Sequence, residues 1–163
     1  MDRIGKTSIF KCILLLSAAL SFLVLTGCGS GLPWKINEHS NTTVYTGDDV
    51  KLSIADKSLT NAGCTYLLKN DRDSTIYSSE IFCLQIWFDN KWNGIDAESS
   101  FPASMLVLQE KQTAENTVSW KTIYGELPAG RYRLLVPFRS NDNAFSPEYY
   151  VAAEFMINIT NSY

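Results

Sequence analysis

Residues 127–133 read Leu-Pro-Ala-Gly-Arg-Tyr-Arg, and this short stretch says most about how the chain folds. Pro128 and Gly130 are turn residues, and they come just before an alternating run that is typical of a β-strand. Tyr132 enters that strand at a point where its hydroxyl can donate a hydrogen bond back to the preceding loop. Such a tyrosine corner occurs where a chain crosses between two packed sheets. The stretch therefore predicts a β-sandwich.

From Val44 onward the chain alternates apolar and polar residues in short runs separated by turn residues, which predicts β-strands throughout. No run has the spacing of an amphipathic helix. The expected strands are residues 50–54, 64–68, 75–77 continuing at 81–88 after an interruption at 78–80, 105–108, 117–123, 131–138 and 149–159, with loops at 93–102 and 109–116. This pattern predicts an all-β sandwich of about seven antiparallel strands.

Two stretches carry a family resemblance, residues 124–133 (YGELPAGRYR) and the closing residues 149–157 (YYVAAEFMI). They look like a bacterial immunoglobulin-like domain family of secreted and lipid-anchored proteins, and the likeness runs from about residue 50 to residue 159. The sequence departs from the usual pattern at Ser78-Ser79 and at Gln85, which affects the expected local strand geometry. The resemblance implies an immunoglobulin-like β-sandwich outside the cytoplasm. It supplies no catalytic residues and no cofactor.

The N-terminal stretch has the layout of a secretory signal. Basic residues at positions 3, 6 and 11 precede an apolar run, Ile13 to Leu25, whose 13 residues are fewer than the roughly 20 of a membrane-spanning helix. The run ends in Leu25-Thr26-Gly27-Cys28, which resembles the lipobox of bacterial lipoproteins. Cleavage before Cys28 would expose its amine and leave its thiol for a diacylglycerol group, and stable anchoring needs more than one acyl chain. The alternative is an ordinary signal peptide cut nearby, with no role for Cys28.

We therefore expect a signal peptide over residues 1–27, a lipid-anchored tether over 28–43 and an immunoglobulin-like domain over 44–163. The tether is rich in Gly, Ser, Asn and Pro. Loss of the signal removes three basic residues and one acidic residue, so the net charge changes from −3 to −5 in the remaining 136 residues. An acidic domain without a Lys/Arg cluster argues against nucleic acid as a partner. The expected location is the extracytoplasmic side of a bacterial membrane.

Two cysteines remain in the expected mature domain, Cys64 and Cys83, because Cys12 leaves with the signal and Cys28 carries the lipid. An extracytoplasmic setting permits a disulfide between them. A hairpin with its turn at residues 70–74 would bring them near each other, although Cys83 alternates out of phase with its apolar neighbours and a β-bulge would have to correct the phase. Two separate thiols that act as small apolar side chains are the alternative.

No set of residues suited to catalysis is evident. The single histidine, His39, falls in the expected tether, where nothing rigid would position it as a base. Three oxygen-rich clusters, Asp48-Asp49, residues 70–73 and residues 141–143, lack a full calcium-loop spacing and are ordinary turn sequences. No His/Cys spacing indicates zinc. The sequence predicts neither an enzyme nor a metal or cofactor site.

Tryptophans are the remaining signal for a binding site. Trp87 alternates with the apolar positions of its strand, so it should point away from the core. The core side of that strand is expected to consist of Phe82, Leu84, Ile86 and Phe88. Together with Trp92, Trp87 would form an exposed platform for a partner. The alternative is a cross-strand aromatic pair that only covers the sheet.

The function that these features favour is a noncatalytic, lipid-anchored domain that binds a protein or a cell-envelope component. Contact would be made by the Trp87/Trp92 face or by the loops at 93–102 and 140–147. A carbohydrate-binding module is an alternative, and it would need aromatic and polar groups that converge on one exposed surface. A protease inhibitor is another, and it would need an exposed rigid loop.

Overall fold

The computed structural model describes residues 34–37, 42–96 and 104–158, and these residues contain ten strands and one short helix. The elements are β1 (Ile36–Asn37), β2 (Val50–Ile54), β3 (Gly63–Asn70), β4 (Ile76–Ser79), β5 (Cys83–Phe88), β6 (Lys91–Ile95), β7 (Met105–Leu108), β8 (Thr113–Ser119), α1 (Lys121–Tyr124), β9 (Gly130–Arg139) and β10 (Tyr149–Ile157). Within the described residues, no helix is long and apolar enough to cross a bilayer.

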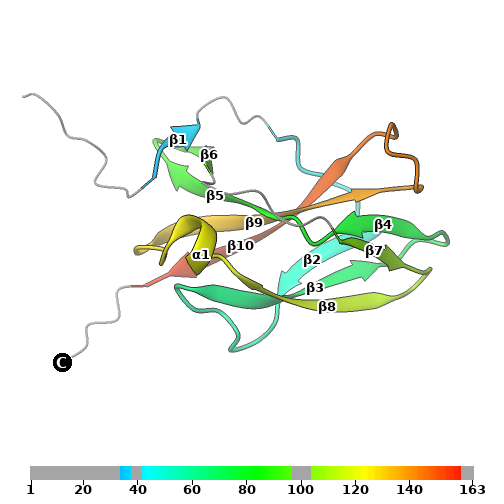
Figure 1. Ribbon diagram of the computed structural model, residues 1–163, viewed down its shortest axis with the longest axis horizontal. Helices are drawn as coiled ribbons and strands as arrows, with labels where there is room; N and C mark the ends of the chain where they lie inside the picture. The colour runs from blue at the N-terminus through cyan, green and yellow to red at the C-terminus, as the bar shows by residue number, and fades with distance from the viewer. Residues whose placement is uncertain (1–33, 38–41, 97–103, 159–163) are drawn as a thin grey trace, which may run out of the picture. The chain divides into compact units, whose positions relative to one another are not determined.

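The strands form two sheets, as the sequence predicts for a sandwich (Figure 1). The smaller sheet has the order β2-β3-β8. The larger sheet has seven strands in the order β1-β6-β5-β9-β4-β7, with β10 on the other side of β9. All pairings between these strands are antiparallel. The predicted all-β immunoglobulin-like sandwich is confirmed, with more strands than the seven expected.

Strand β9 is the centre of the larger sheet, because it pairs with β10 from Gly130 to Phe138 on one side and with both β5 and β4 on the other. Ser78 lies opposite Phe138, and Cys83 lies opposite Leu135. Five steps along β4–β5 therefore match three steps along β9, which is the geometry of a bulge. The predicted interruption at residues 78–80 marks this place. The two extra residues leave the alternation unchanged, so Cys83, five residues after buried Ser78, points to the opposite face of the sheet.

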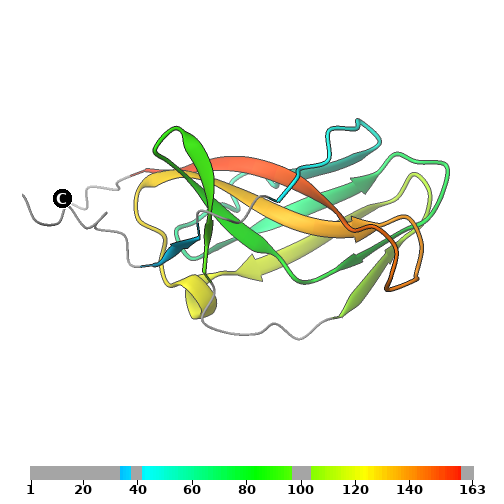
Figure 2. The ribbon, with the colours of Figure 1, turned by 90° about the horizontal axis from the view of Figure 1, so that it is seen from above.

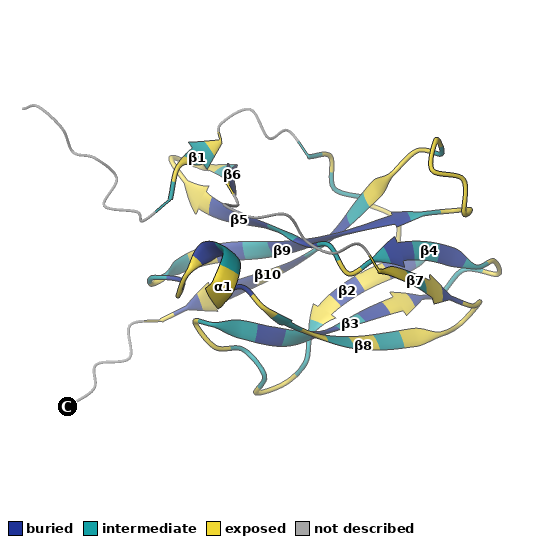
Figure 3. Ribbon diagram, in the orientation of Figure 1, coloured by how far each residue is buried: buried dark blue, intermediate teal, exposed yellow. Residues whose placement is uncertain are grey.

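The core lies between the two sheets and is lined by alternate residues of each strand (Figure 3). Trp120 is fully buried and stacks on Phe155, with ring centroids 5.4 Å apart. Tyr132 also stacks on Phe155, with ring centroids 5.7 Å apart. Its hydroxyl donates to the Pro128 carbonyl at 2.9 Å, which is the hydrogen bond of the predicted tyrosine corner. Residues 127–133 thus fix where the chain enters β9.

The hairpin expected at residues 70–74 is absent, because β3 and β4 belong to different sheets. Asn70 explains the crossing. Its buried amide donates to the carbonyls of Ser74, Leu108 and Gln109, so it holds the linking segment against the end of β7. Residues 70–74 have the sequence of a turn, but this turn carries the chain from one sheet to the other.

Four further expectations were wrong. The expected strand at residues 117–123 is instead the end of β8 followed by α1, and the expected loop at 109–116 contains the first residues of β8. The expected loop at 93–102 contains the end of β6. Phe88 was expected in the core, yet it is 44% exposed because β5 runs beyond the end of the core there.

The packed domain also begins earlier than residue 44. β1 pairs with the edge of β6, with Ile36 opposite Ile95. Trp34 donates its indole N–H to the carbonyl of Tyr124 and packs edge-on against Tyr132, 6.3 Å between ring centroids. These contacts place Ile36 and Asn37 in the sheet and Trp34 against the domain, although the sequence assigned residues 34–37 to the tether.

Candidate functional site

The two tryptophans singled out in the sequence meet on the outer face of the larger sheet. Trp87 on β5 lies opposite Trp92 on β6, with ring centroids 5.2 Å apart and an edge-to-face angle of 71°. The turn between them is short, and Asp89 and Asn90 both have positive φ, 52° and 57°, as a tight type I′ hairpin requires. The pair is therefore held in register by its own hairpin, and Trp87 remains 36% exposed.

Two arginines from β9 complete this site. The Arg131 guanidinium lies 5.1 Å from the Trp87 ring centroid and 5.3 Å from that of Trp92. The Arg133 guanidinium lies 4.7 Å from Trp92. All three distances are within the range of cation–π attraction. We call Trp87, Trp92, Arg131 and Arg133 the Trp–Arg cluster.

Neither arginine was predicted from the sequence as part of a site, although a signal for both was present. Arg131 and Arg133 flank Tyr132, the tyrosine of the predicted corner, whose side chain is buried in the core. In a strand, neighbours of an inward-facing residue point outward. What the sequence could not supply was the pairing of β9 with β5, which puts the two arginines on the same outer face as Trp87.

The two arginines of the Trp–Arg cluster differ in their partners, because Arg131 forms an ion pair and Arg133 bonds to a neutral amide. Glu154 of β10 accepts a hydrogen bond from the Arg131 Nη2 atom at 2.7 Å. Arg133 instead donates from Nε to the amide oxygen Oε1 of Gln85 at 2.6 Å. Partial burial lowers the pKa of Arg133, while the nearby Glu154 carboxylate opposes that shift. The cluster therefore presents two guanidinium groups against one carboxylate.

The Trp–Arg cluster is suited to recognition, because tryptophan and arginine are the residue types that most often dominate binding energy at protein interfaces. The guanidinium groups lie over the indole rings, so the ring surfaces are partly covered by the protein itself. A sugar ring stacking on these indoles would have to displace an arginine. The arrangement favours a partner that hydrogen-bonds to the arginines over one that stacks on the tryptophans.

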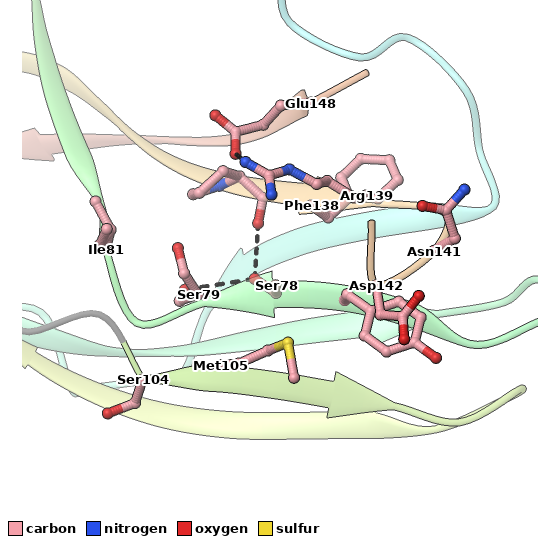
Figure 4. A pocket seen from close by; sticks show the side chains of 12 residues that line it. Ser78, Ser79, Ile81, Ser104, Met105, Phe138, Arg139, Asn141, Asp142 and Glu148 are labelled. Carbon is pink, nitrogen blue, oxygen red and sulfur yellow. Dashed lines mark hydrogen bonds and ion pairs between the residues drawn. The ribbon is translucent and has the colours of Figure 1, made fainter. Parts of the chain in front are cut away.

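A cavity of about 250 Å³ lies at the bulge, between β4, the start of β7 and the β9–β10 loop (Figure 4). Its Ser78 hydroxyl donates to the Pro137 carbonyl at 2.7 Å, and Arg139 pairs with Glu148 at 2.7 Å. Figure 4 shows these groups in its wall. A nucleophilic serine needs a base within hydrogen-bond reach, whereas Ser78 is engaged with a backbone carbonyl. The cavity thus has no assembled nucleophile and base among the described residues.

The cysteines lie on different sheets and are both free. Cys64 of β3 is buried in the core, and burial raises the pKa of its thiol to about 12. Cys83 lies opposite Leu135 on the outer side of the larger sheet, and burial raises the pKa of its thiol as well. The disulfide considered in the sequence analysis is not formed, because the hairpin that would have joined the two strands does not exist.

The oxygen-rich clusters are occupied by structural contacts. Asp49 accepts a hydrogen bond from the Tyr45 hydroxyl at 2.6 Å, and that bond lowers the pKa of its carboxyl. Asp71 pairs with Lys69, and Asp73 pairs with Lys111. No group of three or more potential metal ligands occurs in the described part of the chain.

Two other residues named in the sequence analysis, Cys28 and His39, lie outside the described residues. The β9–β10 loop adds one feature that the sequence did not single out, since Phe145 is 96% exposed at its tip. That loop and the β5–β6 hairpin lie toward opposite ends of the strands (Figures 1 and 2).

The comparisons with known proteins agree with the fold. Residues 35–156 match the family described as bacterial Ig-like domain. A search of curated proteins found no match. The matched range begins next to Trp34 and ends in β10, so it covers both sheets and the whole Trp–Arg cluster.

Proposed function

Since the chain belongs to the bacterial Ig-like domain family, we propose that it is a noncatalytic binding domain that a lipid on Cys28 displays on the extracytoplasmic side of a bacterial membrane. The observation that carries the binding role is the Trp–Arg cluster. Four side chains of the types most common at binding hot spots lie together on an outer sheet face, and Trp87 is 36% exposed. The partner is a protein or another component of the cell envelope.

The anchor part of the proposal rests on the sequence. Leu25-Thr26-Gly27-Cys28 closes an apolar run behind basic residues, which is the order of a lipoprotein signal. Only residues 29–33 separate Cys28 from Trp34, where the packed domain begins, so the segment that starts with Cys28 has six residues. Six residues reach at most about 20 Å, so the domain would stay close to the membrane surface.

Binding is tested by photo-crosslinking the full-length lipidated protein in its native envelope, with the photoreactive residue in place of exposed Met156, which lies opposite Arg131 on β10. Trp87→Ala with Trp92→Ala should abolish the crosslink while the circular dichroism spectrum stays unchanged. Phe145→Ala is the matched control, because it removes an exposed aromatic ring elsewhere on the domain. An undiminished crosslink in the double variant would exclude this face as the binding site.

The anchor is tested separately by fractionation. Cys28→Ala should either leave the signal uncleaved or release the domain from the membrane. A processed variant that stays fully in the membrane fraction would contradict lipid attachment at Cys28. The two tests are independent, because the first reads out contact and the second reads out location.

A further inference from the structure

Arg133 is held in one orientation by its neighbours. Its Nε atom donates to Gln85 Oε1 at 2.6 Å, and Gln85 is itself only 1% exposed. The guanidinium carbon lies 4.7 Å from the centroid of the Trp92 ring. Register places Arg133 between Gln85 on β5 and Glu154 on β10. The Gln85 hydrogen bond holds the guanidinium at Nε, and the Trp92 ring limits its movement. The two Nη groups therefore point in a defined direction.

The charge of Arg133 has no ion-pair partner in the described part of the chain. Glu154 is the carboxylate directly opposite on β10, but its Oε2 atom accepts from Arg131 at 2.7 Å. The hydrogen bond that Arg133 makes to a described residue uses Nε, so its Nη groups are left for another acceptor. Removing a charge from water without pairing it is unfavourable, and Arg133 is half-buried. An incoming anion would therefore replace the interactions with water that the Arg133 guanidinium loses through partial burial.

A carboxylate matches this arrangement best. Its two oxygens lie at the spacing of the guanidinium fork, so they accept two parallel hydrogen bonds, and a pre-oriented fork loses little entropy on binding. The covered indole rings argue against a sugar acid, because a sugar ring would have no free aromatic face to stack on. An acidic side chain of a protein needs only the fork.

We propose that Arg133 binds an Asp or Glu side chain of a partner protein in a bidentate pair, with Trp87 and Trp92 forming the apolar contact beside it. This inference rests on the proposed function and adds the chemistry of the partner. The chain as a whole carries a net charge of −3, so long-range attraction does not favour an acidic partner. Recognition would depend on this local pair.

The fork is tested directly by NMR on the folded protein, with N-acetylglutamate N-methylamide as the probe. Its glutamine counterpart has the same size and no charge, so it serves as the matched probe. The Arg133 side-chain Nε–H signal, assigned by its loss in Arg133→Lys, should shift saturably with the acid and not with the amide. Equal shifts with both probes, or a shift confined to Arg131, would overturn the assignment.

The envelope crosslink at position 156 separates this inference from the function on which it rests. Arg133→Gln and Arg133→Lys should both reduce the yield by roughly ten- to a hundredfold, because a charge-assisted pair contributes that much and lysine lacks the fork. Arg72→Gln, on an arginine paired with Asp49, is the matched control. Loss in the Trp87/Trp92 variant with full yield in Arg133→Gln would overturn the carboxylate pair and leave the binding face standing. Full yield in both variants, or no crosslink in the wild type, would overturn both.

Discussion

Tyr132→Phe tests the contact that defines the fold, because it removes one oxygen atom and leaves the buried ring in place. The Tyr132 residue has no exposed surface, and its hydroxyl donates to the Pro128 carbonyl at 2.9 Å. A hydrogen bond of this kind contributes about 1 kcal/mol, and an unpaired buried carbonyl adds a further cost. Since Pro128 keeps partial access to water, we expect the free energy of unfolding to fall by about 1–2 kcal/mol.

The measurement is equilibrium unfolding in urea, where the midpoint should fall and the slope should stay constant. Tyr66→Phe is the matched control. Tyr66 is equally buried, but its hydroxyl makes no hydrogen bond of normal geometry to a described residue, and the Asn116 side chain beside it only partly opposes the burial that raises the pKa of Tyr66. Removing an unsatisfied hydroxyl should leave stability unchanged or raise it by up to about 1 kcal/mol. Equal losses in the two variants, or no loss in Tyr132→Phe, would refute the reasoning.

Three further changes test other contacts by the same unfolding assay. Burial raises the pKa of the Cys64 thiol from 9.0 to about 12, so the folded state keeps a proton that the unfolded state releases, and stability should fall between pH 9 and pH 12. Between pH 9 and pH 12 the free energy of unfolding of Cys64→Ala should fall by about 4 kcal/mol less than that of the wild type. The same pH dependence in both proteins would contradict the raised pKa of Cys64. Trp34→Ala should destabilise the domain by about 2 kcal/mol, and Lys35→Ala, at an exposed residue, should not. Equal stability of the two variants would indicate that residues 34–37 belong to the tether. Lys57 has a φ of 60°, so Lys57→Gly should stabilise by about 1 kcal/mol relative to Lys57→Ala, and the opposite order would rule out strain there.

Features that depend on neighbouring residues could be predicted from the sequence. Alternation located most strands, because the side-chain period of two is a local property. The tyrosine corner joins residues only four apart, so its turn and strand signals lie in one short stretch.

Strand pairing could not be predicted in the same way. The segment after Asn70 has the composition of a hairpin turn, but composition does not distinguish a turn within one sheet from a crossing between two. The Asn70 amide decides for the crossing by bonding carbonyls that lie 38 and 39 residues away. The possible disulfide between Cys64 and Cys83 depended on that hairpin, and without it the alternative of two separate thiols holds.

Only the two tryptophans of the Trp–Arg cluster could be predicted from the sequence. Trp87 and Trp92 face each other across a tight turn, so their contact is local and was predicted as a pair. The arginines arrive from a strand about 40 residues later, and only the register of β9 against β5 brings them over the rings. Charge counting could not find them either, because two basic residues in an acidic chain form no visible run.

The position of β1 changes what the proposed anchor can do. A tether over residues 28–43 would reach roughly 55 Å, whereas residues 28–33 reach at most about 20 Å. Pairing of Ile36 with Ile95 and docking of Trp34 against Tyr132 account for the difference, because they fix the chain to the sheet that carries the Trp–Arg cluster. With lipid on Cys28, the cluster would meet partners that are themselves at or near the membrane surface. A short reach also raises the effective concentration of such partners, so a contact built on one bidentate pair and two indoles can be weak in solution and still be occupied at the membrane.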